Sequence, residues 1–253
     1  MSALKVLGTA ARVGGTFASY LTFRAVRNPR ASREFFKTVA NTIVDFRPEP
    51  NAHLKTVSLE EFFPGITHAA TQPLDVTQGV WEAPPAEYEC LAKLATHLKP
   101  RTVFEFGTYR GRTTRLLAEH AVEQARIYTL ELDPEETRRR WGKPSELVGQ
   151  AFRQTPLERK IVQLYTDDRT FDFQPYYGAM DLIFIDANHR YEAVKRDTAE
   201  ALRMIKPGGV VVWDDYRPQQ PGVMHCVNEL ARRVSGLAQV QGTRFACYKA
   251  PRT

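Results

Sequence analysis

The chain has 253 residues, enough for one large domain with an appendage or for two small domains. Hydrophobic residues make up 43% of the sequence and charged residues 25%, which is ordinary for a globular protein. Three widely spaced cysteines argue against a disulfide framework and a cysteine metal site, and no apolar run reaches the roughly 20 residues that span a bilayer. We therefore expect a cytoplasmic protein.

The formal net charge of +6 is concentrated at the amino terminus. Residues 1–47 hold eight basic residues against two acidic ones, whereas residues 48–253 hold 27 of each sign. Because the body of the chain is neutral overall, we expect no nucleic-acid partner for it.

Residues 1–80 are expected to form a basic helical arm followed by an extended segment. The first 47 residues allow three interpretations: a basic amphipathic helix on a membrane surface or a partner, an organelle transit peptide, or helices that cover the main domain or a homo-oligomer interface. Ser58 begins a short predicted helix in the extended segment. The main domain is placed at residues 81–253.

Strands and helices alternate from the start of this main domain. Helical spacing of apolar residues predicts helices over 86–98 and 113–122. Short runs of β-forming apolar residues predict buried strands at 103–106 and 127–132. This alternation is typical of a parallel sheet with helices on both faces.

A glycine turn follows the first of these strands. Gly107 and Gly111 bracket the turn in the motif E-F-G-T-Y-R-G, which lacks the middle glycine of the dinucleotide fingerprint and is not a P-loop. Bare backbone lets a ligand approach, and Glu131 at the tip of the next strand can accept hydrogen bonds from a ribose. Residues 105–133 thus suggest a nucleotide-type cofactor, while a turn that merely serves the fold is the alternative.

The middle of the chain continues the pattern. A helix that starts at Pro134 is followed by a second predicted helix over 145–153 and a strand over 161–165. Asp167 and Asp168 follow that strand, at the edge of the sheet where ligands of open α/β folds bind. Ordinary turn chemistry is the alternative explanation for these two acids.

Carboxylates close the next two strands as well. The strand over 182–185 ends at Asp186, and the strand over 210–213 ends at Asp214 and Asp215. Adjacent parallel strands would bring the three carboxylates to one edge, where their repulsion calls for a cation or a raised pKa. Such oxygen ligands suit Mg²⁺, which would acidify a bound substrate hydroxyl.

The remaining elements complete the predicted sheet. A helix over 191–205 joins the two acid-tipped strands, and another begins near Pro221. The segments 239–241 and 244–248 are predicted to form an antiparallel pair at the edge of the sheet.

Four segments along residues 80–250 resemble those of the class I S-adenosylmethionine-dependent methyltransferases. They are E-F-G-T-Y-R-G, Y-T-L-E-L-D, F-I-D-A-N-H-R-Y-E and I-K-P-G-G-V-V-V-W-D-D-Y. Within that superfamily, the last two segments resemble the macrocin-type and aminocoumarin sugar O-methyltransferases and, more distantly, the catechol and caffeoyl-CoA O-methyltransferases. The resemblance implies an α/β, Rossmann-like sheet of seven mostly parallel strands in the order 3-2-1-4-5-7-6, with helices on both faces.

The resemblance also implies roles for individual residues. It assigns S-adenosylmethionine binding to Glu105, Gly107, Thr108, Gly111, Glu131, Asp167 and Asp186. It assigns Mg²⁺ binding to Asp186, Asp214 and Asp215. His189 stands where relatives carry a lysine or histidine base, and Asn188 cannot replace the acid that other relatives use. The alternative for His189 is a helix-capping or surface role.

These implications define an expected enzyme. It would be an S-adenosylmethionine-dependent, Mg²⁺-assisted O-methyltransferase that acts on a hydroxyl of a small molecule, such as a sugar of a glycosylated metabolite or polysaccharide. Two alternatives stay open. One is a metal-independent methyltransferase with another nucleophile as its acceptor, and the other is a non-catalytic cofactor-binding scaffold recruited to a membrane through residues 1–47.

Overall fold

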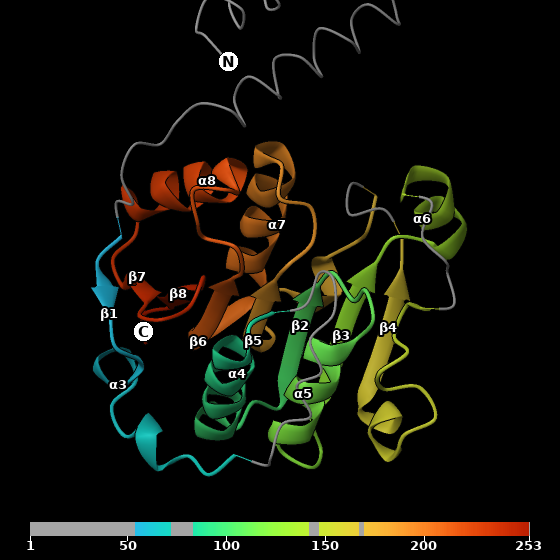
Figure 1. The fold of residues 1–253 in the computed structure, drawn as a ribbon, viewed down its shortest axis with the longest axis horizontal. Coiled ribbons are helices and arrows are strands. Elements are labelled where there is room, and N and C mark those ends of the chain that lie inside the picture. Colours follow the sequence, from blue (N-terminus) through green and yellow to red (C-terminus); the bar gives the residue numbers. More distant parts are fainter. Residues whose placement is uncertain (1–53, 72–82, 142–146, 167–169, 253) are drawn as a thin grey trace, which may run out of the picture. The chain divides into compact units, whose positions relative to one another are not determined.

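Helices and strands alternate along the main domain, from Pro85 to Ala231, as the sequence pattern predicts (Figure 1). The computed structural model describes residues 54–71, 83–141, 147–166 and 170–252. Residues 48–253 form one unit, and residues 1–47 form another that lies wholly outside the described residues. The predictions for the basic arm therefore stay predictions.

Eight strands form one sheet in the described part of the chain, in the order β1-β7-β8-β6-β5-β2-β3-β4. Their bounds are Thr56–Val57 (β1), Thr102–Phe106 (β2), Arg126–Glu131 (β3), Ile161–Tyr165 (β4), Met180–Ile185 (β5), Ile205–Trp213 (β6), Leu237–Val240 (β7) and Ala246–Lys249 (β8). All neighbouring strands are parallel except that β8 runs antiparallel to both β6 and β7. The predicted order of seven strands is confirmed.

The eighth strand, β1, corrects the predicted strand number. It pairs with β7 in parallel, with Thr56 opposite Gln239 and Val57 opposite Val240. A strand of two residues is too short to show a period in the sequence. The sheet thus takes one strand from the segment that the sequence analysis assigned to the arm.

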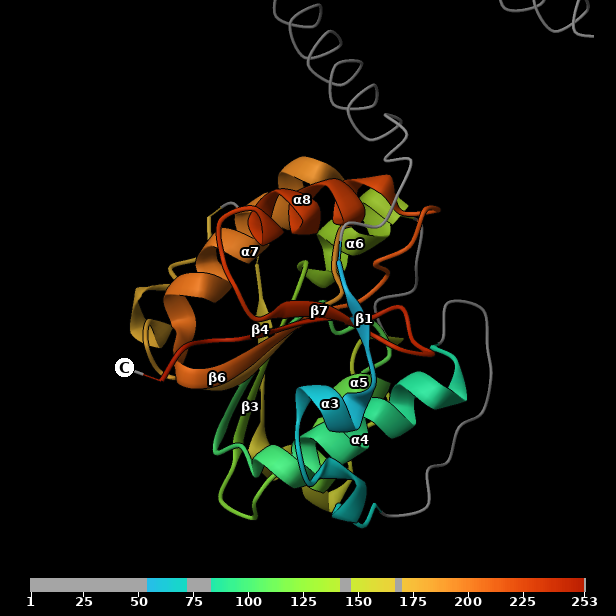
Figure 2. The same ribbon diagram turned by 90° about the vertical axis from the view of Figure 1, so that its left-hand side faces the viewer.

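Helices cover both faces of the sheet, as expected (Figure 2). Their bounds are Leu59–Phe62 (α3), Pro85–Leu98 (α4), Arg112–His120 (α5), Pro134–Trp141 (α6), Tyr191–Met204 (α7) and Pro221–Ala231 (α8), with 3₁₀ helices at Ile66–His68 (η1), Pro156–Lys160 (η3) and Gln174–Tyr176 (η4). The helices α3, α4 and α5 lie on one side of the sheet, and α6, α7 and α8 lie on the other. Within the described ranges, no helix has the length and apolarity needed to cross a bilayer.

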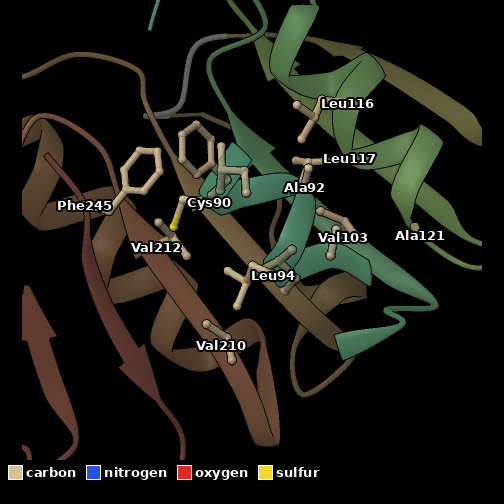
Figure 3. Close-up of a cluster of buried hydrophobic side chains, with 14 of the residues drawn as sticks. Cys90, Ala92, Leu94, Val103, Leu116, Leu117, Ala121, Val210, Val212 and Phe245 are labelled. Carbon is tan, nitrogen blue, oxygen red and sulfur yellow. The ribbon is translucent and has the colours of Figure 1, made fainter. Parts of the chain in front are cut away.

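The central strand β2 sends alternate side chains into two layers. Val103 belongs to the core that β2 shares with α4 and α5, where it is buried with Leu94 and Leu117 (Figure 3). Phe104 and Phe106 belong to the other layer. Rings that surround these two phenylalanines belong to Tyr128, Phe171, Phe173 and Tyr176. Burial on both faces explains why this strand is an almost unbroken apolar run.

The predicted helix over 145–153 is wrong in its described part, which forms turns. Gly149 has a φ of +71°, and its N–H donates to the Tyr109 carbonyl at 2.8 Å. The Ala151 N–H donates to the Arg110 carbonyl, also at 2.8 Å. Backbone donors that a helix would use internally therefore pair with the loop after β2, so a tertiary contact replaces local helix formation.

Candidate active site

The carboxyl ends of the parallel strands lie side by side at one edge of the sheet. Hydrogen bonds extend the ladders one residue past the strands: the Gly107 N–H donates to the Leu130 carbonyl at 2.8 Å and the Asp186 N–H to the Phe106 carbonyl at 2.9 Å. The Asp214 N–H donates to the Ile185 carbonyl at 3.0 Å. The glycine turn and the acid-tipped strands are therefore neighbours, as the sequence analysis predicted from parallel pairing.

Position 107 accepts only glycine in this fold. Its φ is +94°, and a Cβ at this position would lie 2.0 Å from the Asp186 carbonyl oxygen. Gly111 has a φ of +75°, and a Cβ there would lie 2.6 Å from the Phe152 ring. Both glycines thus allow a close approach of the turn to neighbouring segments, in addition to a left-handed backbone.

The Glu131 carboxylate, at the end of β3, binds the backbone of the glycine turn. Its Oε2 accepts the Tyr109 N–H at 2.8 Å, and its Oε1 accepts the Leu132 N–H at 2.9 Å. An ionised carboxylate has about four acceptor sites, so each oxygen keeps capacity for a further donor such as a ribose hydroxyl. Glu131 thus has room for a further hydrogen bond, and its contact with a ribose stays a prediction.

Glu105 is fully buried beneath the turn, with 0% of its surface exposed. Its Oε2 accepts hydroxyl hydrogens from Thr114 at 2.5 Å and Thr129 at 2.6 Å, and its Oε1 has no hydrogen-bond partner among the described residues. Burial raises the pKa of Glu105 to about 8. The carboxyl therefore ties β2 to β3 and α5, and its contact with a cofactor stays a prediction.

Thr108 lies in the same hydrogen-bonded group. Its hydroxyl and that of Thr129 are 2.7 Å apart, and Gln163 on β4 donates to the Thr108 hydroxyl at 2.9 Å. Sequence reasoning did not identify Thr129 or Gln163, because no motif marks them. The predicted cofactor ligand Asp167, two residues after β4, lies outside the described residues.

His189 stands between two of the acids. Its Nε2 lies 3.3 Å from Asp186 Oδ1 and 3.6 Å from Asp215 Oδ2. Burial lowers the pKa of His189, but the hydrogen bond to Asp186 and the negative charges of both acids outweigh that effect, so its pKa is raised. The arrangement supports an imidazole that can take up a proton.

Asp214 and Asp215 are both buried, at 7% and 5% exposure. The Asp215 N–H donates to Asp214 Oδ1 at 2.6 Å, and Asp215 has a φ of +57°. Burial, followed by the charges of Asp186 and Asp215, raises the pKa of Asp214 well above its usual range. The sequence analysis expected a cation or a raised pKa at this edge, and here one acid has its pKa raised.

Arg244 supplies the cation at this edge. Its Nη1 donates to Asp215 Oδ1 at 2.8 Å, and its Nε donates to Glu87 Oε1 at 2.7 Å. Arg217 Nε also lies 2.9 Å from Asp215 Oδ1, although without hydrogen-bond geometry. Sequence reasoning missed Glu87 and Arg244, which lie 157 residues apart in the chain, so only the fold brings them together.

The three aspartates do not fit Mg²⁺ in this arrangement. Mg²⁺ requires a near-octahedral shell of oxygens at about 2.0–2.1 Å. Asp215 Oδ1 is already bound to Arg244, and Asp214 Oδ1 is bound to a backbone N–H. Across the described ranges, no three or more histidine, cysteine, aspartate or glutamate side chains are grouped so that they could hold a metal ion.

Comparisons with known proteins agree with the fold. Residues 104–216 match the family model described as a methyltransferase domain. Catechol O-methyltransferase domain-containing protein 1 of Mus musculus is 26% identical over 249 residues, covering 92% of this chain and 88% of that protein. An uncharacterized protein of Acanthamoeba polyphaga mimivirus is 32% identical over 74 residues, 28% of this chain and 31% of that protein.

A solved structure shows the same fold. The crystal structure of the O-methyltransferase TomG from Streptomyces achromogenes, in complex with S-adenosylmethionine, is similar with a TM-score of 0.52 and 18% identity. The similarity covers 79% of this chain and 92% of that chain. The family match includes the glycine turn, Glu131, Asp186 and His189. Residues 104–216 are therefore similar to a methyltransferase domain, and the chain shares the fold of that O-methyltransferase, which agrees with the sequence resemblance.

Proposed function

We propose that this protein transfers a methyl group from S-adenosylmethionine to a hydroxyl oxygen of a small molecule. The observation that carries the proposal is the position of His189. It follows β5 by four residues and lies 3.3 Å from Asp186, whose backbone directly abuts the glycine turn at Gly107. A base is thus next to the segment expected to hold the methyl donor.

The chemistry requires little more than position and proton removal. An oxygen attacks the methyl carbon in line with the departing sulfur, so an O–CH₃ bond forms as the S–CH₃ bond breaks. The hydroxyl proton passes to the imidazole. If Nε2–H points to Asp186, then Nδ1 is the nitrogen that accepts this proton, and the two aspartates stabilise the imidazolium that results.

The His189→Ala variant tests this role. Loss of a general base should lower kcat by about 10²–10⁴-fold while the affinity for S-adenosylmethionine stays nearly unchanged, because the base does not hold the donor. Steady-state kinetics and titration calorimetry measure the two quantities. His68→Ala, at an exposed site in η1, is the control and should behave as the wild type. An unchanged kcat in His189→Ala would remove His189 from the mechanism.

The acceptor and the metal are finer parts of the proposal. A sugar hydroxyl is the acceptor that the subgroup resemblance suggests, and a panel of glycosylated and phenolic acceptors compares it with other hydroxyls. Magnesium assistance, also suggested by the resemblance, would require Asp215 to release or share Arg244. The contacts of Arg244 favour the metal-independent form.

The scaffold alternative makes different predictions. A non-catalytic protein would bind S-adenosylmethionine without turnover on any acceptor. A cytoplasmic protein recruited to membranes would bind anionic liposomes, and deletion of residues 1–47 would abolish that binding because eight of their residues are basic. Turnover on any hydroxylated acceptor would exclude the scaffold as a complete description.

A further inference from the structure

Two residues that no motif identified hold the acidic edge together. Glu87, in the first turn of α4, is 1% exposed. Arg244 lies between β7 and β8, and its side chain is 22% exposed. Arg244 contacts Glu87 Oε1 twice, through Nε at 2.7 Å and through its backbone N–H at 2.8 Å. One side of the guanidinium is therefore fixed by a buried carboxylate.

The other side of the guanidinium faces the two acids after β6. Its Nη1 donates to Asp215 Oδ1 at 2.8 Å, and its Nη2 lies 3.8 Å from Asp214 Oδ2. The Tyr216 N–H donates to the Arg244 carbonyl at 2.8 Å, which joins the two backbones as well. Arg244 and Asp215 are thus held together by main-chain and side-chain contacts.

These contacts continue to the proposed base. Asp215 binds Arg244 through Oδ1, and its second oxygen, Oδ2, lies 3.6 Å from His189 Nε2. The series Glu87–Arg244–Asp215 therefore ends at His189. Arginine is always charged, and a buried carboxylate that loses its cation is strongly destabilised.

A divalent ion would compete directly with this arrangement. To reach Asp215 Oδ1 the ion would have to displace Arg244 or share its oxygen, next to a fixed positive charge. The ion and the guanidinium would both contact the same carboxylate oxygen, and two cations that close together repel each other more strongly where water is excluded. Arg217 Nε also lies 2.9 Å from this oxygen, so an Mg²⁺ ion at Asp215 Oδ1 would be opposed by two guanidinium groups.

The geometry points to Arg244, held by Glu87, as the residue that takes the place of a divalent metal at this edge, so that methyl transfer requires no metal ion. Arg244 offsets the buried aspartates and fixes Asp215 beside His189. It is a positioning residue, because it acts on the base through Asp215. This inference rests on the proposed function. The experiments below have different outcomes for a failure of the inference and for a failure of the proposed function.

The first experiment measures metal binding and metal dependence on the full-length wild-type protein. Mn²⁺ serves as the probe, and the free ion is followed by electron paramagnetic resonance. We expect no stoichiometric Mn²⁺ binding and equal rates in excess EDTA and in Mg²⁺. Stoichiometric Mn²⁺ binding at this edge, or loss of activity in EDTA, would overturn the inference whatever the acceptor. Absence of turnover on every acceptor would instead count against the proposed function.

Variants of the pair test Arg244 itself. Arg244→Met should lower kcat by about 100-fold in EDTA, as expected for a misplaced base, with little change in KM for S-adenosylmethionine. Arg244→Lys keeps the charge and should recover part of the rate, which a purely structural loss would not allow. Arg244→Met should also bind Mn²⁺ more tightly than the wild type, because one of the two guanidinium groups beside Asp215 is then removed. Arg244→Met with wild-type kcat would contradict the inference.

Two further variants distinguish a loss of activity from a loss of the fold. The double variant Glu87→Leu/Arg244→Met removes Glu87 together with its cation, so that Glu87 is not left buried and unpaired, while Arg217 stays 2.9 Å from Asp215. It should fold and still lose about 100-fold in kcat. Arg115→Met breaks the exposed pair of Arg115 with Glu119 on α5 and should keep the wild-type rate. A fully active, folded double variant would overturn the role of the pair.

Discussion

At the scale of single residues, the buried acid Glu105 is the feature with the clearest measurable consequence. Its carboxyl has one oxygen bound to two threonine hydroxyls and one oxygen without a partner among the described residues. Burial without a cation raises its pKa to about 8 from an ordinary 4.5. The native protein therefore keeps a proton on Glu105 at a pH where the unfolded chain has released it.

This proton uptake predicts a pH-dependent stability. A raised native pKa gives stability that is fully present below pH 4.5 and is lost as the pH rises through about 8. Glu105→Gln cannot titrate, although its amide oxygen can accept the same threonine hydroxyls. Urea unfolding between pH 5 and pH 8.5 should show the wild type losing a few kcal/mol relative to the Gln variant. Parallel curves for the two proteins would mean that Glu105 is ionised in the native state.

Residue identity alone does not reveal such roles. The family resemblance implied a base at His189, and the structure places this residue between Asp186 and Asp215. Arg244, in contrast, lies in a segment with no motif, and it contacts the site only because β8 packs beside β6. Its other partner, Glu87, lies 157 residues away, and such a contact has no signature in a single sequence.

At the scale of elements, the turn between β2 and α5 depends on close backbone packing. Gly107→Ala would combine a left-handed φ of +94° with a Cβ placed 2.0 Å from the Asp186 carbonyl. The backbone strain costs about 1–3 kcal/mol, and the clash must add to it because a carbonyl cannot move aside without shifting β5. We expect a larger loss in the free energy of unfolding than strain alone gives, together with weaker S-adenosylmethionine binding.

Gly65→Ala is the matched control for this prediction. Gly65 has a similar φ of +88°, but a Cβ there would have nothing within 4 Å. The difference between the two variants in urea unfolding isolates the clash from the backbone strain. Equal losses would show that the approach to Asp186 is less tight than the geometry requires.

The elements also show where local patterns succeed and fail. The strand β4 and the helix α4 match their predictions within a residue, because apolar periodicity is strong in both. The helix predicted over 145–153 does not form in its described part, where Gly149 pairs with the glycine turn instead. The strand β6 begins at Ile205, before the predicted start at residue 210, and a β-bulge accommodates the extra residues.

At the scale of the whole sheet, the short edge strand β1 joins a distant part of the chain to β7. The Gln239 N–H donates to the Lys55 carbonyl at 3.0 Å, and the Gln241 N–H donates to the Val57 carbonyl at 2.8 Å. The Val57 side chain is 6% exposed. The edge of the sheet is therefore held by a few contacts of high sequence separation, which makes it a region expected to open locally.

The variant Val57→Asp tests this edge. A charge at a buried position should detach β1, so hydrogen exchange should accelerate at the Gln239 and Gln241 amides before the rest of the sheet opens. Thr56→Asp places the same charge on the exposed side of the strand and should leave both amides protected. Exchange that stays slow in Val57→Asp would show that β1 contributes little to the edge.

The sequence by itself determined most of the fold and the position of the candidate site. Apolar periodicity, glycine positions and acids at strand ends predicted a mostly parallel sheet and the edge that carries Glu131 and Asp186, and the family resemblance implied the order of seven strands and a role for His189. These features are local, and parallel pairing then brings strand ends together without further information.

Only the tertiary structure decided how the charges at that edge are balanced. The sequence suggested Mg²⁺ for three converging acids, yet Asp215 is bound by Arg244, and Arg244 by Glu87. The eighth strand β1 likewise arises from a pairing of distant segments. Glu87 lies 157 residues from Arg244, and β1 pairs with a strand that is equally remote in the chain, so only packing of the whole sheet brings these groups into contact.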